Sequence, residues 1–272
     1  ARTDQKNEVL KGIAQALTGN AGLIVEKNKL DMSKSKEMGI SDSMLDRLML
    51  DEARIAKIAA SISQVIDYND PVGEVIFGYN LPNGLMLKNI RVPLGVVGII
   101  YEARPNVTVD ASVLCLKAGN CVILRGSSTA INSNMVLVDI MRKVLSEHGF
   151  SQDIIQIIPT VQREDAVKLM QLREYVDVLI PRGGKELIDS VVANSRVPVI
   201  ETGVGNCHLY IDQALEGIEY EVVEGIVVNS KTQRPSVCNA AEKLLVHQQV
   251  AGDMLPRLAS KLHSLGVKLV GC

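Results

Sequence analysis

The strongest constraint on the fold is an alternation, between residues 96 and 200, of short apolar runs with longer amphipathic segments. The apolar runs have the length of strands, and the segments between them carry hydrophobic residues at helical spacing. We predict strands at 96–100, 121–124, 154–158, 176–180 and 197–200, and helices at 109–118, 134–147, 165–172 and 185–194. Strands this apolar are buried on both faces, so helices must cover both sides of a parallel sheet. The sequence therefore predicts a doubly wound α/β domain, which binds nucleotides at the carboxyl ends of its strands.

The flanking segments predict further elements. Residues 5–67 show helical spacing, interrupted at 38–42 by a helix stop and a new N-cap. Residues 74–79 and 85–92 are strand-like runs, and the Asn-Gly at the end of the intervening turn predicts a β-hairpin. Towards the C-terminus we predict a strand at 226–232, a strand from residue 240, a helix at 250–265 and a strand at 267–270.

The predicted elements divide the chain into three parts. A cofactor-binding domain spans 1–73 and 92–225, and the hairpin at 74–91 interrupts it. Residues 226–272 form the start of a second α/β domain, the catalytic one. Because a β-α-β unit that has just begun cannot bury its sheet alone, we expect this second domain to be incomplete in the chain.

Composition excludes several classes of function. The net charge of −2 and an aromatic content of 3% without tryptophan disfavour nucleic-acid binding. No apolar run reaches the roughly 20 residues that span a bilayer, and no signal peptide is visible. The five cysteines form no CxxC pair, and the four histidines are dispersed. This pattern favours a reducing compartment, such as the cytoplasm, and disfavours a metal site or a disulfide framework.

The segment 229–240 is a candidate catalytic loop because it combines a cysteine with two cations. Positive charge from Lys231 and Arg234 would stabilise a Cys238 thiolate, as would the backbone N–H groups of a helix N-terminus. The same cations, with Asn229, would attract a substrate that carries phosphate. The spacing alone leaves an ordinary polar loop with a half-buried cysteine equally open.

Residues 101–108 follow one predicted strand and precede a helix. The amide of Asn106 could donate to a developing oxyanion, and Arg104 could pair with a carboxylate or phosphate. Taken alone, a helix N-cap is the more frequent role of such an asparagine. Both interpretations stay open at this point.

Three other strand ends carry candidate cofactor contacts. In the turn at 181–185, Arg182, Gly183 and Gly184 suit a close approach to a pyrophosphate, although such turns are often plain loops. After the strand at 121–124, a cation and hydroxyl groups stand where sites for NAD often carry an acid, which favours the 2′-phosphate of NADP. The residues concerned there are Arg125 and Ser127.

The last predicted strand of the sheet is followed by Glu201 and Gly203. An apolar strand next to Glu201 would raise the pKa of this carboxyl, and the glycine would let a ligand approach the backbone. Cys207 and His208 are neighbours in sequence. Because neighbours on a strand point to opposite faces, we do not expect them to form a catalytic pair.

These segments together resemble the aldehyde dehydrogenase superfamily and, within it, the gamma-glutamyl phosphate reductases (glutamate-5-semialdehyde dehydrogenases). The resemblance covers essentially the whole chain. Its most specific parts are four strings in the same order, YEARPNVT at 101–108, IPRGG at 180–184, ETGVGNCH at 201–208 and KTQRPSVCNA at 231–240.

The resemblance implies NADPH-dependent reduction of L-glutamyl 5-phosphate to L-glutamate 5-semialdehyde with release of phosphate, the second step of proline biosynthesis from glutamate. It implies that Cys238 is the catalytic thiol, which forms a thioester, and that Asn106 belongs to the oxyanion hole. Arg125 takes the place of a cofactor-contacting lysine, and Glu201 that of a water-activating glutamate. Since hydrolysis would waste a thioester, we expect Glu201 to have a structural or cofactor-orienting role.

The resemblance also implies an oligomer, a dimer or larger, because the hairpin at 74–91 matches an oligomerisation arm. It implies a functional link to glutamate 5-kinase and a chain that continues beyond residue 272. Four alternatives stay open: an aldehyde-oxidising dehydrogenase, half of a bifunctional kinase–reductase, a silent assembly module and a thiol hydrolase. The residues that bind the α-amino and α-carboxylate groups of the substrate are not identifiable from the sequence.

Overall fold

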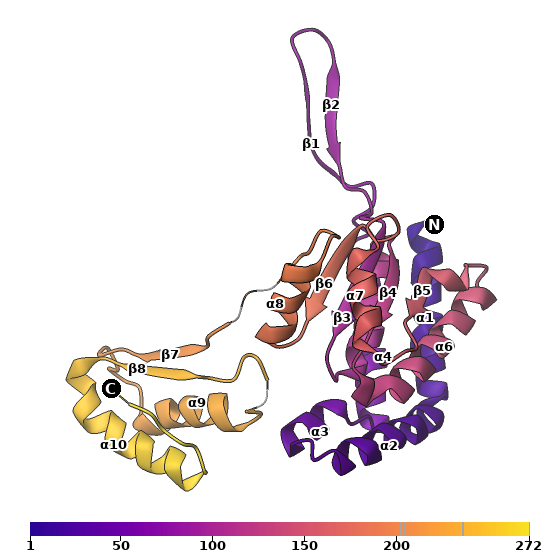
Figure 1. Cartoon of the computed structure of the whole chain (residues 1–272). Helices are drawn as coiled ribbons and strands as arrows, with labels where there is room; N and C mark the ends of the chain where they lie inside the picture. The colour runs from indigo at the N-terminus through magenta and orange to yellow at the C-terminus, as the bar shows by residue number, and fades with distance from the viewer. Residues whose placement is uncertain (202, 204, 236, 272) are drawn as a thin grey trace. The chain divides into compact units, whose positions relative to one another are not determined.

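The computed structural model describes residues 1–201, 203, 205–235 and 237–271, and the chain forms two compact units, 1–202 and 203–272 (Figure 1). The first unit begins with four helices, α1 (Thr3–Gly19), α2 (Ala21–Glu37), α3 (Asp42–Leu48) and α4 (Glu52–Asp67). The prediction of helices over 5–67 is thus confirmed, with one additional break between α1 and α2 and another between α3 and α4. At the latter break Asp51 caps α4, because its side chain accepts a hydrogen bond from Arg54 N at 2.7 Å.

The centre of this unit is a parallel sheet of four strands in the order β5-β4-β3-β6. The strands are β3 (Val96–Tyr101), β4 (Cys121–Arg125), β5 (Ile155–Ile157) and β6 (Val178–Arg182), and helices α5 (Pro105–Lys117), α6 (Ile131–Glu147), α7 (Arg163–Gln171) and α8 (Lys185–Asn194) connect or follow them. The helix predicted at 109–118 begins four residues earlier, at Pro105, because proline is pre-organised for the first turn of a helix.

Helices cover both faces of the sheet, which confirms the doubly wound prediction. Along β3, Val97 and Ile99 pack into a core formed with α1, α4, α5 and α6. Ile100 faces the other way and packs with residues of α7 and α8. Gly98 shares that second face, where a Cβ atom would lie 2.4 Å from Leu179 Cδ2. A side chain at this position would therefore displace the buried Leu179 side chain of β6.

A buried carboxylate of α2 holds the start of α6. The side chain of Asp31 is 1% exposed. It accepts hydrogen bonds from the backbone nitrogens of Asn132 and Ser133, at 3.2 and 2.8 Å, and from both of their side chains. Unpaired N–H groups at a helix start need such acceptors, and a negative charge there also complements the helix dipole.

The prediction of a strand at 197–200 is wrong. The segment makes one isolated bridge to β6, through Leu179 and Val199, with Leu179 N donating to Pro198 O at 2.8 Å. Pro198 has no N–H to continue the ladder, so the pairing ends after one residue.

The second unit is a β-α-β-α arrangement of β7 (His208–Ile211), α9 (Tyr220–Thr232), β8 (Lys243–Val246) and α10 (Gln248–Ser264). β7 and β8 are parallel, with His208 opposite Lys243. The sequence placed the start of a second domain at 226, whereas this unit begins at 203, because β7 pairs with β8 rather than with the four-stranded sheet.

Two predicted strands in this unit are wrong. Residues 226–232 belong to α9, whose buried residues Val223 and Val227 are one helical turn apart. A short run of β-branched residues fits a strand and a buried helix equally well. Residues 267–270 form no strand in the described chain, and Val270 is 90% exposed. An extended segment becomes a strand only when a neighbouring strand pairs with it.

The predicted hairpin is present as β1 (Val75–Asn80) and β2 (Met86–Ile90), paired antiparallel with Asn80 opposite Met86 (Figure 1). Gly84 in the turn has a φ of 84°, which a residue with a side chain rarely adopts. Apolar side chains on both strands are exposed, among them Val75, Ile76, Phe77, Tyr79, Met86 and Ile90.

Candidate active site

The carboxyl ends of β3 and β6 meet where the direction of the crossovers reverses. The connections through α5 and α6 lead from β3 outward to β5, and α7 then leads back to β6 on the other side. Tyr101 and Arg182, the last residues of β3 and β6, are partners in the register, and Glu102 N donates to Arg182 O at 3.2 Å. Ligands of open α/β sheets bind outside such a switch point. The candidate site therefore starts from the residues that follow these two strands.

Asn106 lies in the first turn of α5, whose N-cap is Arg104. The alternative that Asn106 itself caps the helix is therefore wrong. Asn106 Nδ2 donates to Asp110 Oδ2 at 3.0 Å. Burial raises the pKa of Asp110, while the hydrogen bond from Asn106 and the charge of Arg182 oppose that rise. The amide thus lies beside a carboxylate that the sequence did not single out.

Glu102 lies against the Gly183–Gly184 turn, a contact that sequence reasoning missed. Glu102 Oε1 accepts a hydrogen bond from Gly184 N at 2.9 Å, at the N-terminus of α8. A Cβ atom at Gly183 would lie 2.7 Å from Glu102 Cδ. The turn does place backbone N–H next to an anion, but the anion here is a side chain of the chain itself. The one signal in the sequence was an acidic residue directly after an apolar strand.

Arg125, at the end of β4, donates to three backbone carbonyl oxygens, those of Gly126, Val161 and Gln162, at 2.6 to 3.3 Å. Its Nε is buried and has no hydrogen-bond partner among the described residues. Burial lowers the pKa of this guanidinium. Ser127 caps the short turn before α6. Both residues predicted to favour NADP therefore lie together after β4.

A buried polar network lies directly beneath the start of α5. Tyr101 Oη and Thr108 Oγ1 are 2.7 Å apart, and Thr108 Oγ1 donates to Asn134 Oδ1 at 2.9 Å. Since a threonine hydroxyl has one hydrogen, Tyr101 must be the donor in the first bond. Burial raises the pKa of Tyr101 and keeps it protonated. A Cβ atom at Gly126 would lie 2.2 Å from Asn134 Nδ2, so glycine there makes room for the network.

In the second unit, Asn229 and Lys231 belong to the last turns of α9, and Arg234 and Cys238 lie in the connection from α9 to β8. Cys238 thus follows the C-terminus of a helix, and the expected helix N-terminus is absent from this connection as far as the structure describes it. The helix ends before the loop because Pro235 cannot continue it.

Cys238 is exposed, and the backbone around it is pinned at two places. Ala240 N donates to Val237 O at 3.2 Å, and Ala241 N donates to Ser230 O at 3.0 Å. Cys207 Sγ donates to Cys238 O at 3.4 Å, a contact that no sequence pattern indicated. Ser236, two residues before the thiol, lies outside the described residues.

Glu201 lies at the end of the first unit, and Gly203 is the first residue of the second unit. Glu201 is exposed, contrary to the expectation of an apolar surrounding, because the strand before it is reduced to one bridge. The hydrogen bond to Asp189 and the charge of Asp189 raise the pKa of Lys185, and the charge of Glu201 adds to that rise. A Cβ atom at Gly203 would meet nothing within 4 Å. Thr202 and Val204, which flank this glycine, lie outside the described residues.

Apart from Glu201 and Gly203, the predicted residues therefore form two groups. Around the strand ends of the first unit lie Arg104, Asn106, Arg125, Ser127, Arg182, Gly183 and Gly184. Around the end of α9 in the second unit lie Asn229, Lys231, Arg234 and Cys238. Because these groups belong to different units, the meeting of Cys238 with Asn106 stays a prediction.

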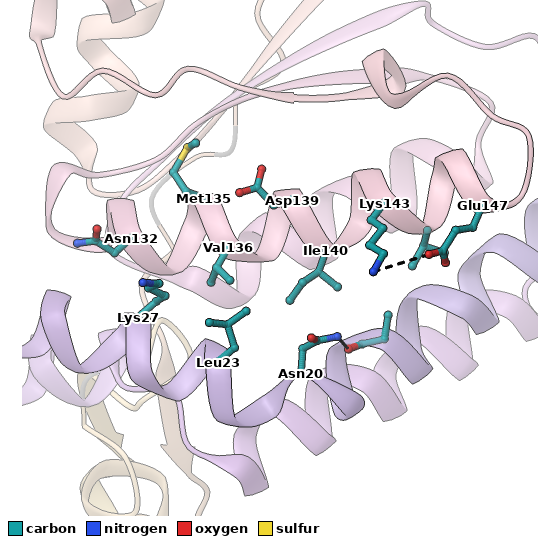
Figure 2. Close-up of a pocket in the computed structure, with 12 residues that line it drawn as sticks. Asn20, Leu23, Lys27, Asn132, Met135, Val136, Asp139, Ile140, Lys143 and Glu147 are labelled. Atoms are coloured by element: carbon teal, nitrogen blue, oxygen red, sulfur yellow. Dashed lines mark hydrogen bonds and ion pairs between the residues drawn. The ribbon is translucent and has the colours of Figure 1, made fainter.

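A separate groove of about 580 Å³ runs between α2 and α6. Figure 2 shows Lys27, Asp139, Lys143 and Glu147 around it, with Leu23 and Ile140 between the helices. It contains none of the predicted site residues. Among the described residues no three His, Cys, Asp or Glu side chains gather as metal ligands. The described helices include none that is long and apolar enough to cross a membrane.

Comparison with known proteins supports a close relationship to gamma-glutamyl phosphate reductases. The chain is 54% identical to that of Caldicellulosiruptor saccharolyticus over 268 residues, which cover 98% of this chain and 63% of the relative. It is 52% identical to the reductase of Anoxybacillus flavithermus, over 98% of this chain and 63% of that relative. The chain thus spans somewhat less than two thirds of the length of these curated relatives.

Solved structures agree with this. The crystal structure of gamma-glutamyl phosphate reductase from Thermotoga maritima matches with a TM-score of 0.89 and 43% identity, covering 100% of this chain and 65% of that one. The Saccharomyces cerevisiae enzyme matches with a TM-score of 0.67 and 28% identity, covering 97% and 71%. The model of the aldehyde dehydrogenase family matches residues 2–269. The chain therefore belongs to the aldehyde dehydrogenase family.

Proposed function

We propose that this chain is part of an NADPH-dependent gamma-glutamyl phosphate reductase, which converts L-glutamyl 5-phosphate into L-glutamate 5-semialdehyde and phosphate. The observation that carries the proposal is the identity of 54% and 52% to relatives with that name, over nearly the whole chain. An exposed cysteine in a loop with two cations, in a chain that matches the family over residues 2–269, agrees with it. The reaction would be the second step of proline biosynthesis from glutamate.

The residues after β4 fit an NADP cofactor. Arg125 brings a positive charge, and its buried Nε has no hydrogen-bond partner among the described residues. Ser127 brings a hydroxyl. A guanidinium and hydroxyls are the donors that a 2′-phosphate takes. Arg182, Gly183, Gly184, Glu201 and Gly203 would complete the cofactor site. The bound cofactor would supply the hydride.

The chain's own residues would do the acyl chemistry. The Cys238 thiolate attacks the acyl-phosphate carbonyl, the bond to phosphate breaks, and a thioester remains on the sulfur. The Asn106 amide and the Cys238 N–H stabilise the oxyanion that forms in this step. Lys231 and Arg234 neutralise the departing phosphate, and Arg104 and Asn229 help to bind it. After hydride addition, the thiohemiacetal collapses to the aldehyde and releases the thiol.

The same proposal includes an assembly and a location. The exposed apolar side chains of the hairpin would pair with another copy of the chain, which gives a dimer or larger oligomer. The enzyme would work in the cytoplasm together with glutamate 5-kinase. Glu201 would orient the cofactor, and Glu201→Gln should retain far more activity than a variant without the thiol.

Replacement of Cys238 tests the proposal directly. We expect Cys238→Ala in the full-length protein to lower phosphate-dependent reduction of NADP by L-glutamate 5-semialdehyde by at least about 10³-fold, because alanine has no thiol to form the thioester. Binding of NADPH, followed by its fluorescence, should stay unchanged.

Cys207→Ala is the matched control, because it removes the neighbouring thiol and leaves the nucleophile. Substantial turnover by Cys238→Ala would refute the assignment of the nucleophile. Oxidation of the aldehyde without any need for phosphate would instead identify an aldehyde-oxidising dehydrogenase.

A further inference from the structure

We propose that Asp110 is a positioning residue that holds the Asn106 amide with one N–H directed at the developing oxyanion. The inference rests on the proposed function and adds a group that neither the sequence motifs nor the family name assigns. It starts from the hydrogen bond of 3.0 Å between Asn106 Nδ2 and Asp110 Oδ2, one turn apart on α5.

An ionised carboxylate fixes which end of the amide faces it. A carboxylate only accepts hydrogen bonds, so the nitrogen of Asn106, and not the oxygen, must point towards Asp110. The amide nitrogen has two hydrogens, of which Asp110 takes one. The second is then left as a donor for an oxyanion. Without Asp110, the amide could turn over and present its oxygen to the negative charge instead.

The surroundings of Asp110 suit this role. Asp110 is half-buried on α5, and among the described residues the charge of Arg182, at the end of β6, acts on it and favours its ionised form. A carboxylate close to an oxyanion would repel it, and the positive charge of Arg182 offsets that repulsion. The raised pKa of Asp110 also brings its protonation closer to the pH range of an assay.

Protonation gives the proposal a pH signature. As the pH falls through the raised pKa of Asp110, the group gains a hydrogen and can donate to the Asn106 oxygen, which favours the turned-over amide. Activity should therefore fall on the acid side. Asp110→Asn does not titrate and, like the protonated carboxyl, can donate to the Asn106 oxygen, so it should show reduced activity at every pH and lose that acid limb.

The experiment is a double-mutant cycle on kcat, measured in the full-length protein with the phosphate-dependent reverse reaction. We expect Asp110→Ala to lower kcat by about 10- to 100-fold, as misplacement of a catalytic group does, with KM for NADP unchanged. Asn106→Ala should lower kcat by about 10²–10³-fold. The double variant should be no worse than Asn106→Ala, because Asp110 acts only through that amide. Asp139→Ala, an exposed carboxylate on α6, is the control.

Three results would overturn the inference while leaving the proposed function intact: wild-type kcat in Asp110→Ala, additive losses in the double variant, or an unchanged acid limb in Asp110→Asn. Circular dichroism shows whether each variant is folded, and Asp110→Asn keeps the test valid if Asp110→Ala is not. A wild-type protein without any phosphate-dependent activity would overturn the proposed function itself, and the inference with it.

Discussion

The β3–α5 junction and the α9–β8 connection carry the two halves of the proposed active site, and the protein holds them in different ways. Asn106 lies in the first turn of α5, which is anchored by the buried Tyr101–Thr108–Asn134 network. Cys238 is exposed, and backbone hydrogen bonds and one thiol contact hold its loop. The amide proposed to stabilise the oxyanion is thus pre-organised by the core, whereas the proposed nucleophile is presented from a loop.

The difference predicts where mutations affect stability. Substitutions in the buried surroundings of Asn106 should destabilise the fold, whereas substitutions around Cys238 should affect mainly the chemistry. Three substitutions test this contrast, in order of decreasing effect on the free energy of unfolding.

Asp31→Ala should have the largest effect. It removes a buried acceptor and leaves the N–H groups of Asn132 and Ser133 at the start of α6 without their partner. We expect a loss of about 3 kcal/mol in the free energy of unfolding, measured with urea, because hydrogen bonds to charged groups are worth about 1.5–3 kcal/mol each. Asp31→Asn, which keeps one acceptor oxygen, should lose less. An effect below that of an exposed control such as Asp139→Ala would show that α6 does not need this cap.

Thr108→Val should have an intermediate effect. It keeps the shape of the side chain but leaves the Tyr101 hydroxyl and the Asn134 oxygen unpaired. A buried unsatisfied polar group costs about 1–3 kcal/mol, so urea unfolding should shift by an amount in that range. Thr160→Val, at an exposed position, is the control. Equal stability of both variants would contradict the contrast between the two regions.

Cys207→Ala should have the smallest effect. A thiol is a weak donor, and its contact with Cys238 O is 3.4 Å long. We expect the free energy of unfolding to change by less than about 0.5 kcal/mol. Activity should fall by less than about 10-fold, since each 1.36 kcal/mol of barrier corresponds to a tenfold change in rate. A larger loss of stability would mean that this thiol holds the loop, and the proposed contrast would be too simple.

The sequence by itself determined the class of fold. Apolar strands such as 96–100 and 121–124 allow only a sheet covered on both sides, and the hairpin was readable from its Asn-Gly turn. These signals are local, because they depend on the spacing of residues within one segment. The four strings of the candidate site likewise indicated the aldehyde dehydrogenase family, which the family match confirms.

Only the tertiary structure decided what depends on partners distant in sequence. Residues 197–200 and 267–270 are apolar enough for strands, but pairing fails at Pro198 for the first, and the second has no paired strand in the described chain. The helix over 226–232 is settled by burial of Val223 and Val227. Contacts such as Glu102 with Gly184 join residues 82 positions apart, and no periodicity within a segment encodes them. Spacing fixes which side of an element is apolar, but only folding fixes which polar groups meet.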